Sequence, residues 1–368
     1  MRVQLVDPSG DVTPYDHALA GALARRGAEV ELVTSRFVHG PVPDPQGYSV
    51  SEDFYRRATR HGAKHRRLRR GLKLLEHGPD MLRYRRRAAA ADVRHFQWLP
   101  LEPLDLLLLP RERPRLLTMH NVLRRDGPDR RTRRLAERMD AVVVHTRAGA
   151  GRLAELGVSE DRVRVIPHGA FEHLTRQPNE VPLPEELAAV EGPVVLYFGT
   201  IRPYKGVDVL LEAFSEIDGA ELWVVGSPLG MSMEPLLQLA RVAPGRVRFV
   251  TRYVTDPEAP AFLRRADLLV LPHLQVDQSG VLFAGLAFGK PMVLSDVGGF
   301  GEVARDHGAG RLVPPGDPAA LAGAIRELLA DPGARQALGE RAAAAAAGPF
   351  SWDRIAEGTL SLYEELRR

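Results

Sequence analysis

Short apolar runs alternate with longer amphipathic segments over the first 166 residues of the chain. The apolar runs span 3–6, 29–33, 116–119, 141–144 and 163–166, and the spacing predicts a helix near 15–26. Strands that alternate with helices along a chain pair in parallel, so this pattern predicts a mostly parallel sheet. An Arg-rich helical stretch between residues 51 and 91 interrupts the alternation.

The strand pattern begins again after a connecting segment at 167–192, which contains Pro167, Pro178, Pro182, Pro184 and Gly192. Apolar runs follow at 194–198, 221–225, 247–250, 268–271 and 292–294, each ahead of a predicted helix. We therefore expect two doubly wound α/β domains. The first spans 1–175 and the second 176–349, and a last helix over 350–368 is expected to pack back on the first domain.

The loop after residue 198 carries the clearest chemical signal. The run 194–198 suits a strand buried on both faces, and apolar residues from Val207 to Phe214 recur at helical spacing. Arg202 and Lys205 therefore lie between the carboxyl end of a strand and the amino end of a helix. Free N–H groups and the helix dipole favour anions there, which predicts a site for a phosphorylated ligand.

Composition strengthens the argument for Lys205. Only four of the 50 basic residues are lysine, at positions 64, 73, 205 and 290. A lysine in an anion-binding loop of such an arginine-rich chain indicates that a compact point charge is needed there. The competing interpretation is that Lys205 is one of four scattered exceptions.

A second loop of the same kind precedes the helix predicted after residue 279. Ser279 is a predicted N-cap, and Gly280 permits close backbone approach, so the helix start offers N–H groups to a second anion or to ribose hydroxyls. Simple N-capping is the alternative for this signal alone. The presence of Arg202 and Lys205 at another strand end favours a ligand site.

In combination these motifs resemble family 4 glycosyltransferases of the GT-B fold. The resemblance rests on Gly-Thr-Ile-Arg202-Pro-Tyr-Lys205-Gly, on Gln278-Ser-Gly-Val281, and on 289–299 followed by Glu302, and it covers most of the chain. It implies two Rossmann-like domains that face each other across a cleft. It also implies transfer of a hexose, with retention, from a UDP or GDP sugar to a carbohydrate or polyprenyl-linked acceptor, as in polysaccharide biosynthesis, without a metal or other cofactor.

The resemblance also implies roles for residues of the second domain. Arg202 and Lys205 would neutralise the diphosphate as it leaves, and Glu302 would hold a ribose hydroxyl or position the sugar. The other donor-binding candidates are Gly199, Thr200, Gln278, Ser279, Gly280 and Val281. A leaving diphosphate gains negative charge, so preplaced cations act more strongly on the transition state than on the ground state.

In the first domain the resemblance implies that His120, after a predicted strand, lies near the donor sugar and the acceptor hydroxyl. His145 and His168 occupy similar strand ends with weaker support. Gly10 and Asp11 lie in the segment that is similar to the family's first glycine-rich loop, and they are the acceptor-binding candidates.

One departure from the family pattern concerns the sugar. Many members carry two glutamates eight positions apart, and the aligned positions here are Val276 and Ala284. Gln275 or Asp277 is a substitute sugar ligand, or an ordinary polar loop residue. Two alternatives to a transferase stay open: a catalytically silent GT-B protein that binds nucleotide or scaffolds a membrane complex, and a sugar-nucleotide epimerase, which would need acid and base carboxylates.

Charge is concentrated in one region. Residues 56–87 contain 13 Lys or Arg against Glu76 and Asp80, a local net charge of +11 in a chain of formal net charge +3. With Leu68, Leu72 and Leu75 at helical spacing, this region suits an anionic membrane. A solvated helix face is the alternative, and nucleic acid is less favoured because aromatic residues are sparse.

The remaining sequence features argue against several kinds of site and against a membrane span. The absence of cysteine excludes disulfides and thiolate sites, and no apolar run approaches the length of a membrane span, so we expect a cytosolic protein, or a peripheral one at the inner face of the membrane. No metal cluster is evident, since Asp126 and Asp129 are more simply surface residues. The first loop lacks the G-x-G-x-x-G dinucleotide fingerprint.

Overall fold

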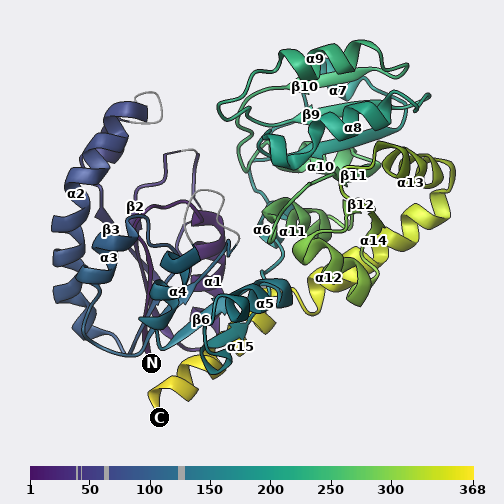
Figure 1. Ribbon diagram of the computed structural model, residues 1–368. Coiled ribbons are helices and arrows are strands. Elements are labelled where there is room, and N and C mark those ends of the chain that lie inside the picture. The colour runs from purple at the N-terminus through teal and green to yellow at the C-terminus, as the bar shows by residue number, and fades with distance from the viewer. Residues whose placement is uncertain (39, 43, 62–65, 123–128) are drawn as a thin grey trace. The chain divides into compact units, whose positions relative to one another are not determined.

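The computed structural model describes residues 1–38, 40–42, 44–61, 66–122 and 129–368, with residues 61, 66, 67, 102 and 129 described by their backbone only. Lys64, Asp126 and the side chain of Asp129 lie outside the described residues. The chain forms two compact units (Figure 1), Met1–Gly169 with Trp352–Arg368, and Ala170–Ser351. The first unit therefore ends a few residues before the expected 175, and it includes the C-terminal helix.

The first unit is built on a seven-stranded parallel sheet with the order β3-β2-β1-β4-β5-β6-β7. Its strands are β1 (Arg2–Asp7), β2 (Glu29–Ser35), β3 (Ser49–Phe54), β4 (Val93–Phe96), β5 (Arg115–Thr118), β6 (Ala141–Val144) and β7 (Val163–Val165). Its helices are α1 (Thr13–Arg25), α2 (Arg66–Arg87), α3 (Glu102–Leu108), α4 (Asp129–Glu137), α5 (Arg147–Glu155) and α15 (Trp352–Arg367). The strand order reverses between β1 and β4, where such sheets bind ligands.

Helices cover both faces of this sheet, which explains the nearly continuous apolar runs of its strands. On one face Val3 and Leu5 join a core with residues of α1 and α15. On the other face Val6 packs in a core with residues of α2, α4 and α5. Helix α15 presents Trp352, Ile355, Ala356, Thr359, Leu362 and Tyr363 as its buried residues, a helical spacing that matches one apolar stripe.

The second unit has a six-stranded parallel sheet with the order β10-β9-β8-β11-β12-β13. Its strands are β8 (Val194–Phe198), β9 (Glu221–Val225), β10 (Val247–Val250), β11 (Leu268–Leu271), β12 (Met292–Ser295) and β13 (Arg311–Val313). Its helices are α6 (Glu172–Thr175), α7 (Glu185–Ala188), α8 (Val207–Phe214), α9 (Glu234–Arg241), α10 (Ala259–Arg265), α11 (Gly280–Ala287), α12 (Gly298–His307), α13 (Pro318–Ala330) and α14 (Pro332–Ala347).

Cores lie on both faces of this second sheet as well. Helices α8, α9 and α13 contribute to the core on one face, and α10, α11, α12 and α14 to the core on the other. The strand order reverses between β8 and β11. Both units are thus doubly wound, as the alternation of strands and helices predicts. Within the described residues, no helix combines the length and the apolar character needed to cross a bilayer.

Three strands were not predicted from the sequence: β3, β4 and β13. Strand β4 is fully buried although it contains Arg94 and His95. The Arg94 guanidinium donates to the carbonyl oxygens of Ala88 and Ala91, and the His95 ring bonds the hydroxyls of Tyr363 (2.6 Å) and Thr118 (2.8 Å). These bonds permit polar residues in a buried strand, which removes the apolar signal on which the prediction depends.

Candidate functional site

The two loops singled out in the second unit meet where its strand order reverses. Strand β8 leads through residues 199–206 into α8, and β11 leads through residues 272–279 into α11. Because β8 and β11 are paired neighbours, both loops leave the same edge of the sheet side by side. This is the position at which open α/β sheets bind phosphorylated ligands.

Direct contacts hold these two loops together. The amide N–H of Leu274 donates to the carbonyl oxygen of Tyr204 at 2.8 Å. Gly206 has a φ of 64°, and a Cβ there would lie 2.0 Å from the carbonyl oxygen of Pro272, so only glycine fits at this crossing. The loop that carries Lys205 therefore has little freedom to move away from the loop that precedes α11.

Lys205 lies beside Gly199 of its own loop, and Gly199 in turn lies beside Val281 of α11. A Cβ added to Gly199 would lie 3.7 Å from Nζ of Lys205 and 3.1 Å from Cγ2 of Val281. Lys205 is 9% exposed and ends a single 3₁₀ turn that begins at Pro203. The Tyr197 hydroxyl donates to the carbonyl oxygen of Thr200 at 2.8 Å, which fixes the start of this loop. The structure thus brings Gly199, Thr200, Lys205 and Val281 to one place.

Helix α8 begins directly after Lys205, and no side chain caps its amino end. Arg202 is partly exposed in the same loop. A buried ammonium, a guanidinium and free helix N–H groups at one strand end form an electropositive site. Such a site can hold the two phosphates of a nucleotide diphosphate.

The start of α11 differs from the expectation in one respect. Ser279 occupies the N-cap position, but its hydroxyl makes no capping hydrogen bond. The Phe171 ring leaves little room for a side chain at Gly280, since a Cβ there would lie 2.9 Å from Cε2 of Phe171. The side-chain oxygen of Gln278 is buried and has no hydrogen-bond partner among the described residues. The amino end of α11 and the Gln278 amide therefore remain available to a ligand.

The two positions at which many family members carry glutamate are part of the core here. Val276 is 7% exposed and Ala284 is 4% exposed, and both pack in the core beside α11 and α12. The backbone carbonyl of the buried Asp277 accepts a bond from the Gly299 N–H at 2.8 Å, which ties this loop to α12. Gln275 is exposed. A carboxylate ligand for the sugar is thus absent from positions 276 and 284.

Glu302 lies on α12, beyond the first turn of that helix. It is partly exposed and follows β12, the neighbour of β11 in the sheet. This placement leaves its predicted role as a ribose or sugar ligand open to test. It is the one donor-binding candidate that lies neither on the two switch-point loops nor in the first turn of α11.

In the first unit, His120 belongs to a buried group of aromatic rings. His120, His145 and His168 follow β5, β6 and β7, and their rings lie 4.8, 5.3 and 4.9 Å from the ring of Tyr15 on α1. Trp352 of α15 closes the group, 5.2 Å from Tyr15. Burial lowers the pKa of His145 to about 4 and that of His168 to about 3, and it also lowers the pKa of His120. The three imidazoles are therefore neutral at pH 7.

Hydrogen bonds determine which nitrogen of His120 carries the proton. Nδ1 of His145 lies 2.9 Å from the carbonyl oxygen of Ile166, so this nitrogen must donate. The other nitrogen of His145 is then an acceptor, and it lies 3.2 Å from Nδ1 of His120. His120 consequently donates from Nδ1 and keeps a lone pair on Nε2. His145 is thus a positioning residue that prepares His120 to accept a proton or a hydrogen bond.

Gln97, at the end of β4, is the partner of that lone pair, and it was missed because β4 was not predicted. Its side-chain oxygen lies 3.3 Å from Nε2 of His120, while its side-chain nitrogen is buried without a hydrogen-bond partner in the described part of the chain. The amide orientation that satisfies both groups turns the Gln97 nitrogen toward Nε2. A ligand hydroxyl would replace this bond.

The first loop of the unit is organised by Asp7 at the end of β1. Its carboxylate accepts bonds from the Ser9 N–H (3.0 Å) and hydroxyl (2.8 Å), and the Ser9 hydroxyl in turn accepts one from the N–H of Asp11 (3.2 Å). The Thr13 hydroxyl donates to the carbonyl oxygen of Gly10 at 2.9 Å. Gly10 and exposed Asp11 are thereby presented at the carboxyl end of β1, beside the switch point of the first sheet.

Comparison with known proteins finds glycosyltransferase matches over both units. Residues 15–170 match the model described as Glycosyltransferase Family 4, and residues 192–331 match the one described as Glycosyl transferases group 1. A D-inositol 3-phosphate glycosyltransferase of Xylanimonas cellulosilytica is 30% identical over 97% of this chain and 92% of its own length. The D-inositol 3-phosphate glycosyltransferase of Nocardia farcinica is 33% identical over 65% of this chain, and that match spans only 56% of the relative's length.

Solved structures share the whole fold at lower identity. Sucrose-phosphate synthase from Thermosynechococcus elongatus has a TM-score of 0.76 and 23% identity, over 100% of this chain and 99% of the other. The Anabaena HepE protein in complex with UDP-glucose has a TM-score of 0.74 and 18% identity, over 100% of both chains. With these matches over both units, the chain belongs to glycosyltransferase family 4 and has the GT-B fold.

Proposed function

We propose that this protein transfers a hexose, with retention, from a UDP or GDP sugar to a carbohydrate or lipid-linked acceptor. The observation that carries the proposal is the position of Lys205, which is buried at the switch point of the second sheet beside Gly199, the residue that borders Val281 of α11. A relative named as a glycosyltransferase and a similar fold solved with UDP-glucose support a nucleotide-sugar donor.

In this mechanism the second unit binds the diphosphate and stabilises it as the bond to the sugar breaks. Lys205 and Arg202 oppose the negative charge that develops on the leaving phosphate. The N–H groups at the start of α11 and the Gln278 amide bind phosphate or ribose. These groups are in place before the reaction, so they need little reorganisation during it.

In the same mechanism the first unit binds the acceptor. The acceptor hydroxyl donates a hydrogen bond to the lone pair on Nε2 of His120, and this nitrogen takes up the proton that the hydroxyl loses as the new glycosidic bond forms. Gly10 and Asp11 contact the acceptor.

No three His, Asp or Glu side chains of the described residues are arranged to hold a metal ion, and independence from metals remains a prediction.

A nucleotide-binding protein without transferase activity is the second candidate. Val276 and Ala284 favour it, because they complete the core where many members present glutamates. An epimerase would require acid and base carboxylates at the sugar, and the same two positions argue against it. Incubation with UDP and GDP sugars distinguishes the three, since only a transferase releases nucleotide diphosphate with hydrolysis or transfer of the sugar.

Nucleotide binding is the first test of the proposed function. We expect UDP or GDP at millimolar concentration to raise the melting temperature, because a ligand at 100 times its Kd stabilises the folded protein by about 2.7 kcal/mol. Thermal denaturation with UDP, GDP, CMP and AMP measures the effect and its base preference. If neither UDP nor GDP raises the melting temperature, the transferase proposal is wrong.

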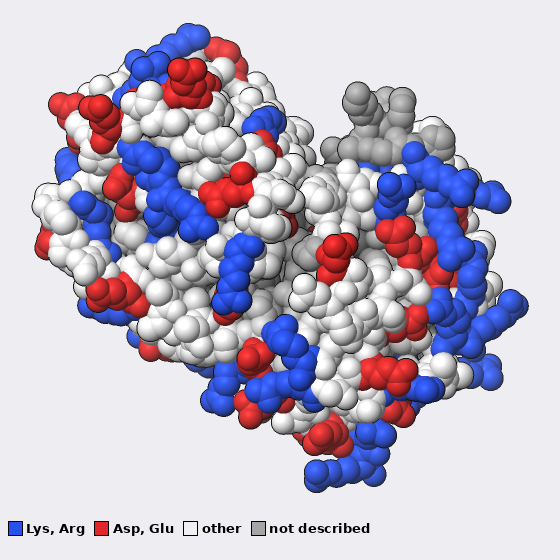
Figure 2. Space-filling model, turned by 180° about the vertical axis from the view of Figure 1, so that it is seen from behind, with Lys and Arg blue, Asp and Glu red and all other residues white. Residues whose placement is uncertain are grey.

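We also propose an anionic membrane as a partner of α2, which would place a cytosolic enzyme at the inner face of the membrane. Leu68, Leu75 and Leu82 are 52%, 75% and 48% exposed at seven-residue spacing on this Arg-rich helix. Figure 2 shows cationic side chains gathered along the edge that α2 forms. Sedimentation with anionic vesicles should decrease as salt rises. Binding that is indifferent to lipid charge would exclude this partner.

A further inference from the structure

A pocket opens at the carboxyl end of β1, entirely within the first unit. It is lined by residues 9–11 after β1, residues 36–38 after β2, Thr59, and Arg69 and Lys73 of α2. The room inside it is about 40 Å³. One water molecule needs about 10–15 Å³ on this measure, so the pocket has room for a small group such as a phosphate and not for a whole sugar. We call it the β1 pocket.

The β1 pocket has an excess of positive charge. Among the described residues that line it, Arg36, Arg69 and Lys73 are cationic, and Asp11 alone is anionic. Nη1 of Arg69 is buried and has no hydrogen-bond partner in the described part of the chain. An unpaired buried donor costs about 1–3 kcal/mol, and more when it is charged. An anion in the pocket would remove that cost.

Lys73 is held at the wall of the β1 pocket by two contacts. Its ammonium donates to the carbonyl oxygen of Ser9 at 3.1 Å and lies 4.8 Å from the centroid of the Tyr55 ring. Burial lowers the pKa of Lys73, an effect that Asp11 opposes and Arg69 reinforces. A bound anion would stabilise the charged form of this lysine and offset its electrostatic repulsion with Arg69.

A buried chain of hydrogen bonds supports the Tyr55 ring. The Asp105 carboxylate accepts from Nε2 of His77 at 2.6 Å, and Nδ1 of His77 accepts from the Tyr55 hydroxyl at 2.6 Å. Tyr55, His77 and Asp105 are 2%, 0% and 0% exposed. Tyr55 has a φ of 53°, which is costly for a bulky residue and persists only where the surroundings impose it. The Tyr55 ring that contacts Lys73 is therefore held in one position.

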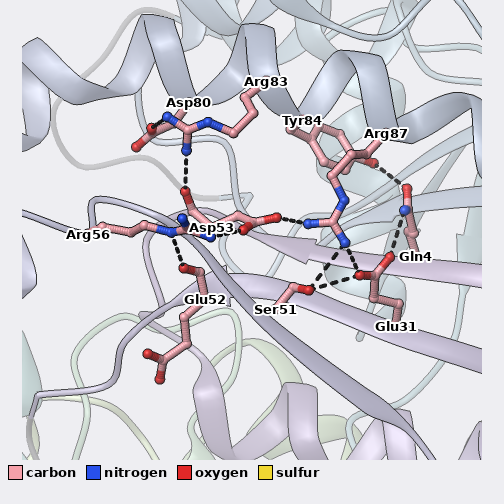
Figure 3. A network of polar contacts seen from close by, with 10 residues as sticks. All are labelled: Gln4, Glu31, Ser51, Glu52, Asp53, Arg56, Asp80, Arg83, Tyr84 and Arg87. Carbon is pink, nitrogen blue, oxygen red and sulfur yellow. Dashed lines mark hydrogen bonds and ion pairs between the residues drawn. The ribbon is translucent and has the colours of Figure 1, made fainter.

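Two cations near the carboxyl end of α2 are paired with carboxylates. Towards the end of the helix, Arg87 pairs with Glu31 and Asp53, and Arg83 pairs with Asp80, as Figure 3 shows. These carboxylates neutralise the helix over β2 and β3. In contrast, Arg69 and Lys73 face a pocket whose lining supplies one carboxylate. The excess charge at the β1 pocket is thus a local feature and does not follow from arginine content alone.

We propose that the β1 pocket binds a phosphate group carried by the acceptor, with Arg36, Arg69 and Lys73 as its ligands. This inference rests on the proposed transferase function and specifies its acceptor class. The phosphate belongs to a soluble sugar phosphate or to a lipid, since both present the same oxygens to the pocket. Arginine forks and a lysine point charge are the side chains that recognise such oxygens.

Phosphate binding without a nucleotide tests the proposal. We would titrate inorganic phosphate, glucose 6-phosphate and glucose into the full chain by calorimetry, for wild type, Lys73→Met, Arg36→Ala and Arg70→Ala. Arg70 is exposed on α2 and does not line the pocket, so its variant is a matched loss of charge. We expect glucose 6-phosphate to bind wild type and Arg70→Ala equally, and Lys73→Met and Arg36→Ala about tenfold more weakly, as a lost charge-assisted contact predicts.

A vesicle series identifies the source of the phosphate. Vesicles with phosphatidic acid expose a phosphate monoester, and phosphatidylglycerol vesicles of matched surface charge are the control, because the membrane attraction proposed for α2 acts on both. If Lys73→Met loses binding only to the soluble probes, the phosphate belongs to a sugar phosphate. If it loses binding only to phosphatidic acid vesicles, the phosphate belongs to a lipid. If every probe binds wild type, Lys73→Met and Arg36→Ala equally, or if Arg70→Ala weakens the binding of the soluble probes as much as they do, the proposal is wrong.

Two measurements keep this result separate from the transferase proposal. The rise in melting temperature with UDP or GDP is measured on the same four proteins, and we expect it to be unchanged, because the pocket lies in the first unit. Absence of that rise would argue against the transferase and leave the phosphate titration valid. If Lys73→Met loses its folded circular dichroism spectrum, the exposed Arg36 decides the outcome through Arg36→Ala.

Discussion

Replacing Lys205 with alanine is expected to lower kcat by about 10² to 10³ while the protein stays folded. The ammonium is placed where the leaving diphosphate gains charge, and loss of one preorganised electrostatic group typically costs that much. Steady-state kinetics with the nucleotide sugar identified by thermal denaturation measures the effect. The Lys205→Arg variant should recover part of the loss at most, because a planar guanidinium does not reproduce a compact point charge.

Lys290 offers a matched control in the same unit. Its ammonium donates to the carbonyl oxygens of Arg264 (2.9 Å) and Ala266 (2.7 Å), so it caps the end of α10. We expect Lys290→Ala to lower the melting temperature and leave kcat unchanged, the reverse of Lys205→Ala. Wild-type turnover in Lys205→Ala would remove this lysine from the site.

Gly226→Ala is expected to reduce the free energy of unfolding by about 3 kcal/mol or more. Gly226 has a φ of 151°, and a Cβ there would lie 1.8 Å from the carbonyl oxygen of Gly199. Backbone strain and forced displacement each cost about 1–3 kcal/mol. Because the displaced residue begins the Lys205 loop, the stabilisation by UDP or GDP should decrease as well. Urea denaturation should show a lower midpoint with an unchanged slope.

Gly219→Ala separates the clash from the backbone strain. Gly219 has a φ of 73° and no atom within 4 Å of an added Cβ. Its substitution should cost only about 1–2 kcal/mol, the penalty of a left-handed conformation. Nucleotide binding should be unaffected. Equal destabilisation by the two variants would show that contact with Gly199 contributes nothing.

Prediction from the sequence was most accurate where the local pattern is strong. Strands β8, β9 and β11 lie at the predicted residues, because strands covered on both faces are apolar throughout. Strand β3 was missed because it lies at the sheet edge and is largely polar. Strand β13 was missed because it offers only two apolar residues, Leu312 and Val313, before two prolines. The N-cap predicted at Ser279 has the expected position without the expected bond.

Two of the described lysines, Lys73 and Lys205, lie at candidate anion sites. Lysine is scarce in this chain, and among the described lysines Lys205 lies at the end of a central strand, Lys73 lines the β1 pocket and Lys290 caps α10. Scarcity alone would have drawn attention to Lys73. What separates Lys73 from the surrounding Arg-rich helix is its contact with Ser9, a residue 64 positions away.

By itself, the sequence determined the alternation of strands and helices in both units, the family, and the loop that holds Arg202 and Lys205, because propensity, spacing and motif are recorded within short segments. Only the tertiary structure decided that β8 lies beside β11, that His145 orients His120, and that Arg36, Arg69 and Lys73 line one pocket. These contacts join residues far apart along the chain. They arise when the strands pair and the helices pack against them, and no local pattern specifies that arrangement.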